Sequence, residues 1–319
     1  MSRLILITAP YFQPVVERFR SRFKERGLEL KIPSVRERLS EEELLPLVGN
    51  IVGAIAGDDQ WTERVLKAAP HLKVISKWGT GIDSIDREAA ERLGIAVRNT
   101  PGAFTEPVAD QVMGYILSFA RRIPWIADEL HQGGWSKQPC VSLTGRTLGV
   151  IGVGNIGKAV VRRARGFEMK LLGNDIVAMP PDFIAETGIR MVDKATLLRE
   201  SDFVSLNCTL NPTSYHIIGA EELTLMKPAS LLVNTARGAL VDEPELVKAL
   251  QSGRLAGAAL DVFETEPLPS DSPLRKMENV LLSPHNANSS PEHWERVHEA
   301  TVEHLFKELD GWESKKVRK

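Results

Sequence analysis

Hydrophobic and polar positions follow two different periods along the chain. Short apolar runs, such as the one at Leu4–Thr8, alternate with longer segments in which apolar residues recur at helical spacing. Val16, Phe19 and Phe23 fall on one helical face, with charged residues largely between them. This exchange of strands and amphipathic helices is typical of a parallel sheet that helices cover on both faces.

Two series of such strands divide the chain. The first predicts strands over Leu4–Thr8, Gly53–Ala56 and Lys73–Ser76. A long apolar helical stripe begins near Thr105. After Gly145 a second series predicts strands over Thr147–Gly152, Met169–Asp175, Phe203–Asn207, Leu231–Ala236, Leu255–Val262 and Val280–Ser283. The sequence therefore predicts an α/β protein with two doubly wound, Rossmann-like domains and a ligand-binding cleft between them.

Composition narrows the class of protein. The 319 residues are 43% hydrophobic and 26% charged, with a formal net charge of −2, which is ordinary for a globular protein of about two domains. The near-neutral balance argues against nucleic acid as a partner, and no apolar run approaches the roughly 20 residues of a membrane span. The two cysteines, Cys140 and Cys208, build neither a disulfide framework nor a zinc site. We expect a reducing, cytoplasmic setting and no metal.

A glycine motif stands at the start of the second series. Gly152, Gly154 and Gly157 follow an apolar strand and precede a helical pattern, the context in which such a motif binds a dinucleotide. The first glycine makes the tight turn, the second lets the backbone approach the pyrophosphate, and the third lets the helix pack on the strand. Asn155 and Ile156 complete the motif at the helix N-terminus, which offers unpaired N–H groups to phosphates.

An acidic residue is expected about 20 positions further on, at the end of the next strand, to bind the ribose 2′-hydroxyl. Asp175 occupies that position. A carboxylate repels a 2′-phosphate, so we predict NAD rather than NADP as the cofactor. The alternative for Asp175 is a plain turn residue.

Three polar side chains follow later strands of the same series. Arg237 ends the run Leu232–Gly238, Glu266 lies just beyond the strand that ends in Asp261-Val262, and His285 follows Ser283-Pro284. Ligands of open α/β sheets bind at the carboxyl ends of the strands. Taken singly, such an arginine is often a surface ion pair and a Ser-Pro-His a turn. Taken together and in order, they indicate an active site.

These motifs resemble the D-isomer-specific 2-hydroxyacid dehydrogenase family. The resemblance covers nearly the whole chain and includes Gly79–Asp83 and Asn99–Gly102. It implies hydride transfer between NAD(H) and a small D-2-hydroxy acid or 2-oxo acid. His285 is then the base for the hydroxyl proton and the acid in reverse, Glu266 orients its ring, and Arg237 grips the substrate carboxylate.

The resemblance also implies further contacts and an assembly. Backbone N–H groups near Trp78, Gly79 and Thr80 are expected to hold the substrate carboxylate. Further residues expected to contact the cofactor are Cys208, Thr209, Pro212, Ala236, Arg237, Asp261 and His285. Residues 1–98 with 291–319 are expected to form the substrate domain and residues 99–290 the NAD-binding domain, in a homodimer built mostly through the latter.

The substrate stays open at this stage. Asp58 and Asp59 stand where phosphoglycerate dehydrogenases commonly carry an arginine, which weakens the case for a phosphorylated substrate, although Lys77 could compensate. Formate dehydrogenases lack the glutamate partner, so Glu266 disfavours formate. The alternatives are a 3-phosphoglycerate-like substrate, an unusual donor such as phosphite, and a co-repressor-like protein that senses NAD and binds partner proteins.

Overall fold

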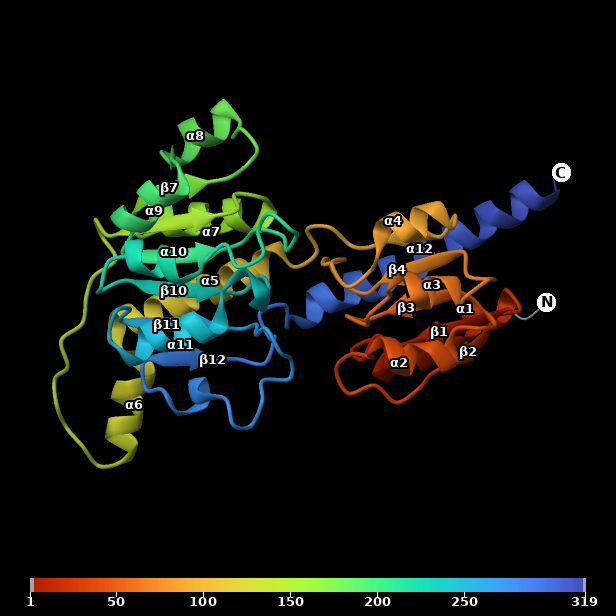
Figure 1. Ribbon diagram of the computed structural model, residues 1–319, viewed down its shortest axis with the longest axis horizontal. Coiled ribbons are helices and arrows are strands. Elements are labelled where there is room, and N and C mark those ends of the chain that lie inside the picture. The colour runs from red at the N-terminus through yellow and green to blue at the C-terminus, as the bar shows by residue number, and fades with distance from the viewer. Residues whose placement is uncertain (1–2, 318–319) are drawn as a thin grey trace. The chain divides into compact units, whose positions relative to one another are not determined.

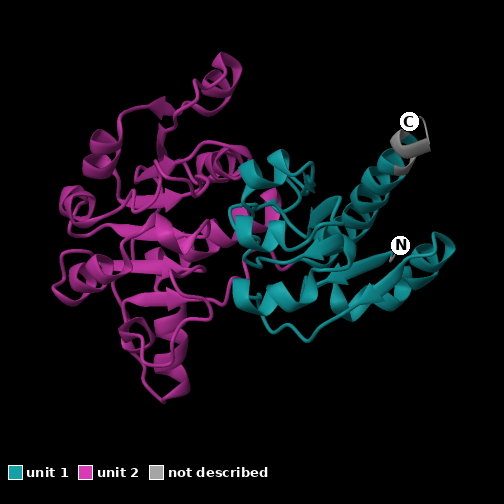
Figure 2. Ribbon diagram, turned by 45° about the vertical axis from the view of Figure 1, so that its right-hand side comes forward, with its two compact units in different colours: residues 1–104, 290–319 teal, residues 105–289 magenta. Residues whose placement is uncertain are grey.

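The computed structural model describes residues 3–317, which belong to two compact units (Figure 2). Unit 1 comprises residues 1–104 and 290–319, and unit 2 comprises residues 105–289. The last helix of the chain therefore belongs to the same unit as the first strand. Each unit has its own parallel sheet.

Unit 1 contains a five-stranded parallel sheet in the order β2-β1-β3-β4-β5. Its strands are β1 (Leu4–Ile7), β2 (Glu29–Lys31), β3 (Ile51–Ala56), β4 (Val74–Lys77) and β5 (Ala96–Arg98). The first strand pairs on both sides, with β2 and β3, so the chain reverses its direction of winding at β1. This order is one of the two common doubly wound arrangements.

Helices cover both faces of the unit 1 sheet. They are η1 (Gln13–Phe19), α1 (Arg20–Glu25), α2 (Glu41–Leu44), η2 (Leu45–Leu47), α3 (Glu63–Lys67), α4 (Arg87–Arg92) and α12 (Pro291–Val317). Thr62 and Asp86 cap the N-termini of α3 and α4 with their side-chain oxygens. On one face the core gathers Leu44, Val65 and Ala89 from these helices. On the other, α12 lies against β3 and β4, and the Ser76 hydroxyl donates to the Thr301 carbonyl at 2.8 Å.

Unit 2 contains a seven-stranded parallel sheet in the order β12-β11-β10-β9-β6-β7-β8 (Figure 1). Its strands are β6 (Thr147–Ile151), β7 (Lys170–Asn174), β8 (Arg190–Met191), β9 (Phe203–Leu206), β10 (Leu231–Asn234), β11 (Gly257–Leu260) and β12 (Val280–Leu282). The winding direction changes between β6 and β9. Doubly wound sheets bind ligands beyond the carboxyl ends of the strands at such a switch point.

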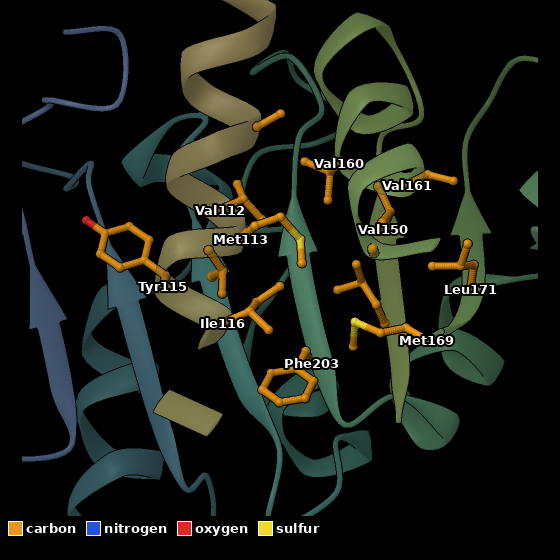
Figure 3. Packing of buried hydrophobic residues seen from close by; sticks show 14 of the residues in the cluster. Val112, Met113, Tyr115, Ile116, Val150, Val160, Val161, Met169, Leu171 and Phe203 are labelled. Atoms are coloured by element: carbon orange, nitrogen blue, oxygen red, sulfur yellow. The ribbon is translucent and has the colours of Figure 1, made fainter. Parts of the chain in front are cut away.

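Successive strand residues of unit 2 point to opposite faces of the sheet and pack into two separate hydrophobic cores. Val150 and Phe203 join α5 (Thr105–Arg121) and α7 (Asn155–Gly166) on one face, as Figure 3 shows. Ile151 and Val204 join the helices of the other face. Those helices are α9 (Lys194–Glu200), α10 (Ala220–Leu225) and α11 (Glu243–Gln251). The remaining helical segments of this unit are α6 (Ile123–His131), α8 (Pro181–Thr187), η3 (Gly238–Leu240) and η4 (Pro273–Lys276).

The α/β, doubly wound fold class predicted from the sequence is confirmed by these two sheets. Each predicted strand is present. The short strands β2, β5 and β8 were not predicted. The unit boundaries lie at 104/105 and 289/290, whereas the sequence suggested 98/99 and 290/291. Residues 99–104 stay with unit 1 because the N–H and the hydroxyl of Thr100 both donate to the Gly79 carbonyl at 2.9 Å.

Candidate active site

The glycine turn lies at the carboxyl end of β6. Helix α7 begins at Asn155, with Gly154 at its N-cap. Gly152 has a φ of +88°, and a side chain there would clash with the backbone of Cys208. A side chain at Gly157 would clash with the Gly152 carbonyl, so α7 packs directly on the turn. Gly154 faces open space, which leaves the backbone accessible where this motif receives a pyrophosphate.

Asp175 follows β7 and is held beside the glycine turn. Its Oδ2 accepts a hydrogen bond from the Val153 N–H at 2.6 Å, and its Oδ1 accepts one from the Val177 N–H at 2.9 Å. The carboxylate therefore lies close to the first turn of α7, which contains Asn155 and Ile156. This is the arrangement in which a carboxylate receives the 2′-hydroxyl of an adenosine ribose.

Two buried oxygen atoms lie at the carboxyl edge of the central strands. Asn207 Oδ1 follows β9 and Thr235 Oγ1 follows β10, and neither has a hydrogen-bond partner among the residues that the structure describes. Buried polar atoms are normally paired, so this edge suits a polar ligand. Together with the open Gly154 and the carboxylate of Asp175, these atoms fit a bound dinucleotide.

The other predicted cofactor contacts lie in the same loops. Thr209 and Pro212 are in the loop after β9, and Ala236 is in the turn after β10, where its N–H donates to Asn234 Oδ1 at 3.1 Å. Cys208 is partly buried, and burial raises the pKa of its thiol to about 11, with the charge of Asp175 adding to the effect. The thiol is therefore kept in its neutral form.

Arg237 lies in the turn that follows β10, directly before the short helix η3. Its carbonyl accepts a hydrogen bond from Asn234 Nδ2 at 2.8 Å, and its own Nη1 donates to the Ala236 carbonyl at 2.8 Å. Asn234 is almost fully buried, so the turn is anchored in the sheet. The guanidinium is thereby fixed at the carboxyl edge of unit 2.

His285 and Glu266 form a hydrogen-bonded pair. Nδ1 of His285 lies 3.0 Å from Oε2 of Glu266, and the two side chains are 24% and 16% exposed. The second carboxylate oxygen of Glu266 accepts the Phe263 N–H at 2.9 Å. His285 has a φ of +51°, a left-handed conformation that few non-glycine residues adopt, and its N–H donates to the Asp261 carbonyl at 2.8 Å. The imidazole is therefore oriented by both its backbone and its partner.

The carboxylate of Asp261 organises the turn that carries His285. It is fully buried and accepts hydrogen bonds from the N–H groups of Asn286 and Ala287 at 2.8 and 2.9 Å, and from the Ser283 hydroxyl. The Tyr115 hydroxyl of α5 lies 2.5 Å from Ser283 Oγ and extends this hydrogen-bond network. The sequence predicted a cofactor contact for Asp261, which stays a prediction, but no role for Tyr115 or Ser283.

Unit 1 carries the segment that the family resemblance assigns to the substrate carboxylate. Lys77 is the last residue of β4, and its side chain is only 4% exposed. Its ammonium lies 3.2 Å from the Asp58 carboxylate and donates to the Trp78 carbonyl at 2.9 Å. Gly79 follows with a φ of +113°, and the Thr80 carbonyl accepts from Asn99 Nδ2 at 2.5 Å. The charge of Lys77 is thus already matched within its own unit.

Aromatic rings surround Trp78. Its ring lies 5.5 Å from that of Tyr11 and 6.1 Å from that of Trp294, measured between centroids. Its Nε1 donates to Nδ1 of the buried His298 at 3.0 Å. Because His298 must accept this hydrogen bond, its neutral form is favoured, and burial lowers the pKa of His298. Sequence reasoning gave His298 no role.

None of the described helices is both long and apolar enough to cross a bilayer. The described histidine, cysteine and acidic side chains form no cluster of three or more that could hold a metal ion.

The sheet order of unit 2 and its glycine turn define a Rossmann domain of the dinucleotide-binding class. Residues 113–287 match the model of the D-isomer specific 2-hydroxyacid dehydrogenase, NAD binding domain. The chain belongs to this family and is an oxidoreductase that transfers a hydride between NAD(H) and a small D-2-hydroxy acid or 2-oxo acid.

Known relatives span several substrates. The chain is 45% identical over 248 residues to a glyoxylate reductase of Korarchaeum cryptofilum, covering 76% of this chain and 74% of the relative. It is 40% identical over 277 residues to a D-3-phosphoglycerate dehydrogenase of Methanocaldococcus jannaschii, covering 86% of this chain but only 52% of that relative. The solved D-lactate dehydrogenase of Aquifex aeolicus, complexed with NAD and lactic acid, superposes with a TM-score of 0.87 at 30% identity, covering 97% and 96% of the two chains.

Proposed function

We propose that this enzyme uses NADH to reduce a small, unphosphorylated 2-oxo acid of the glyoxylate or hydroxypyruvate type. The observation that carries the proposal is the His285–Glu266 pair, whose atoms lie 3.0 Å apart at the carboxyl edge of the sheet that holds the glycine turn. A histidine with a carboxylate on one ring nitrogen is suited to moving a proton at the other. The relationship to a glyoxylate reductase supports the substrate class.

In the proposed reaction, bound NADH supplies the hydride that C2 of the 2-oxo acid receives. His285 Nε2 donates a proton to the C2 oxygen as the carbonyl becomes a hydroxyl. Glu266 favours the imidazolium form before the transfer and holds the ring in place after it. The net change is one 2-oxo acid, one NADH and one proton converted to one 2-hydroxy acid and NAD⁺.

Arg237 holds the substrate in this scheme. Its planar guanidinium binds the carboxylate and polarises the C2 oxygen, where negative charge develops during the reaction. The N–H of Trp78 already donates to the Ala56 carbonyl at 2.9 Å. We therefore assign the N–H groups of Gly79 and Thr80, rather than that of Trp78, to the substrate carboxylate.

The surroundings of Lys77 support an unphosphorylated substrate. A phosphate group requires cations that are not already neutralised. The ammonium of Lys77 is buried and paired with Asp58, and Asp59 is fully buried with its carboxylate accepting the N–H groups of Leu39 and Gly57 at 2.9 and 3.0 Å. Lys77 supports the backbone of Trp78 in this proposal instead of binding a phosphate.

We assign Cys208, Thr209, Pro212, Ala236 and Asp261 to the nicotinamide half of the cofactor.

The enzyme is proposed to act in the cytoplasm as a homodimer. Apolar side chains on and after α6 support a dimer, because Ile123, Leu130 and Trp135 are 54%, 47% and 91% exposed. Light scattering of the purified protein measures the dimer directly.

The test of the substrate is a panel of 2-oxo acids assayed by loss of NADH absorbance, repeated with NADPH. It contains glyoxylate, hydroxypyruvate, pyruvate, phenylpyruvate and phosphohydroxypyruvate. We expect glyoxylate or hydroxypyruvate to exceed phosphohydroxypyruvate by at least about tenfold in kcat/KM, equivalent to about 1.4 kcal/mol, with NADH preferred. A preference for phosphohydroxypyruvate refutes the proposed substrate. Silence on the whole panel with NADH bound indicates an unusual donor or a co-repressor-like protein.

A further inference from the structure

His216 lies in unit 2 between β9 and α10, beside the loop at residues 237–242 that Arg237 begins. The N–H of His216 donates to the Ala239 carbonyl at 2.9 Å, and two further backbone hydrogen bonds join residues 216–218 to the same loop. The backbone around His216 therefore braces the loop that carries Arg237.

The side chain of His216 contacts a second loop. Its Nε2 lies 2.5 Å from Oε1 of Glu264, and its Nδ1 lies 3.6 Å from Oδ2 of Asp242. The ring of Tyr215 stacks on the imidazole, with centroids 4.0 Å apart and an interplanar angle of 15°. The His216 side chain is 27% exposed. The imidazole thus contacts Glu264, Asp242 and Tyr215. It connects Asp242, at the end of the Arg237 loop, with Glu264.

Glu264 is two residues from Glu266, the partner of His285. A side chain at Gly238 would clash with the backbone of Phe263 and Glu264, so the two loops touch backbone to backbone at this point. The Phe263 N–H also donates to Glu266 Oε1 at 2.9 Å. A displacement of Glu264 would therefore move both the Glu266 carboxylate and the residue that follows Arg237.

Two carboxylates, those of Asp242 and Glu264, lie against the His216 imidazole. A third carboxylate, that of Glu243, accepts the Glu264 N–H through Oε2 at 3.2 Å. Burial raises the pKa of Glu243, and the charge of Glu264 adds to this effect. The imidazole lies between the carboxylates of Asp242 and Glu264, so its removal would leave these like charges facing each other.

The backbone of His216 shares an unusual feature with that of His285. Both have left-handed backbones, with φ of +49° and +51°, and the described residues contain two other non-glycine cases, Arg122 and Glu168. Such conformations are disfavoured in residues with a side chain and persist where surrounding contacts fix them. Both histidines pair with a glutamate of the same segment, Glu264 or Glu266.

We propose that His216 is a positioning residue for hydride transfer. It holds the Arg237 loop and the Glu264–Glu266 segment in fixed positions relative to each other. It acts through Glu264 on Glu266, and through the backbone on Arg237. This inference rests on the proposed roles of Arg237, Glu266 and His285.

The test compares H216G, H216N and E264Q with the wild-type enzyme. Glycine accepts the left-handed backbone, so H216G removes the imidazole without backbone strain. We expect its kcat with NADH and the best 2-oxo acid of the panel to fall about 10- to 100-fold, because misplacement of catalytic groups lowers rate more than binding. The Kd for NADH, measured by fluorescence quenching, should stay within about twofold of wild type. H216N can still donate from its amide and tolerates this backbone, so it should recover part of the loss.

Two further measurements separate positioning from a general loss of structure. The pH at which kcat declines should be lower in H216G than in wild type, because a less firmly held Glu266 favours the imidazolium of His285 less. A purely structural defect lowers the amount of active enzyme but does not change the pH dependence of kcat. The H216G/E264Q double variant should be no slower than the slower single variant, since H216G already removes the imidazole with which residue 264 interacts. The matched control is E168G, which replaces an exposed non-glycine residue at a φ of +57° and should keep kcat within about twofold.

Each outcome bears on one proposal. The positioning role of His216 is refuted if H216G keeps kcat within about threefold of wild type, or if the effects of H216G and E264Q on kcat multiply. If H285Q is inactive in the same series, the proposed function survives that refutation. If H285Q is as active as the wild type, the proposed function itself fails. Should H216G not fold, H216N and E264Q decide the question by the same criteria.

Discussion

The groups that the proposed reaction needs are held in different ways in the two units. In unit 2 they are side chains fixed by hydrogen bonds, as in His285 to Glu266 at 3.0 Å and Phe263 to Glu266 at 2.9 Å. In unit 1 the corresponding segment, residues 77–80, is fixed by aromatic packing around Trp78 and by the ion pair of Lys77.

The difference follows from what each unit contributes. Proton transfer depends on the position of individual side-chain atoms, and directional hydrogen bonds define those positions to a few tenths of an ångström. Recognition of a carboxylate by backbone N–H groups only requires the main chain to be held. Packing of large rings and one buried ion pair achieve this without giving the side chains a chemical role. Changes in unit 2 should therefore lower kcat, with or without a change in KM, whereas changes in unit 1 should act on KM or stability.

A large loss of activity is expected when Arg237 is replaced. R237A removes the charge that stabilises the developing C2 oxyanion, so kcat/KM should fall about 10³-fold, equivalent to about 4 kcal/mol. R237K should recover only part, because an ammonium lacks the planar fork. The control is R162A, which removes an exposed ion pair with Glu186 and should change activity little. Steady-state kinetics that show R237A within tenfold of wild type would contradict the role of Arg237.

Cys208 provides a second test in unit 2. Because its pKa is raised from 9.0 to about 11, its thiolate fraction at pH 8 is about 100-fold below that of an unshifted thiol. Its reaction with a chromogenic disulfide should be correspondingly slow and slower still with NADH bound. In this experiment C140S should abolish the fast phase and C208S should not. Equal rates for both thiols would show that the thiol of Cys208 is not shielded.

Lys77 tests the assignment of unit 1. K77M keeps the apolar stem of the side chain but leaves Asp58 without its cation, so the main chain at Gly79 and Thr80 should loosen. We expect KM for the 2-oxo acid to rise about 5- to 10-fold, about 1–1.4 kcal/mol, with kcat within about threefold. The double variant K77M/D58N should recover stability, because it removes both charges of the pair. A fall in kcat with KM unchanged would overturn the division between the units.

The smallest effect concerns His298 and acid stability. Burial lowers its pKa below the ordinary 6.5, so the folded protein keeps the ring neutral while the unfolded chain takes up a proton as the pH falls through that value. This contribution to stability is therefore complete above about pH 6.5 and is lost on acidification towards the lowered value. H298Q can still accept the Trp78 N–H but does not titrate. Between pH 7.5 and 5.5 its Tm should fall by a few degrees less than that of wild type.

The sequence could predict the features that depend on local pattern. Strands buried on both faces, such as Leu231–Asn234, give continuous apolar runs. The short edge strands β2 and β8, which contain Glu29, Lys31 and Arg190, lack that signal and were missed. The glycine turn was predictable because its spacing and its place after a strand are both local.

Features that depend on topology were not predictable in the same way. The contact between Tyr115 and Ser283 joins residues that are 168 positions apart in the sequence, and His216 and Glu264 are in contact although they are 48 positions apart. Only the order of strands brings these pairs together. Strand alternation could not tell whether Lys77 faces outward, and the structure shows its ammonium paired with Asp58. The left-handed backbone of His285 has no signal in the residues around it.

The most direct test of the account is the pH dependence of kcat for the best 2-oxo acid, measured with wild type and H285Q. The account predicts that wild-type reduction declines as the pH is raised and the donor loses its proton. H285Q should be slower by about 10²- to 10⁴-fold, with no such decline and with NADH still bound. An H285Q enzyme within tenfold of wild type, with an unchanged pH profile, would contradict the claim that His285 delivers the proton.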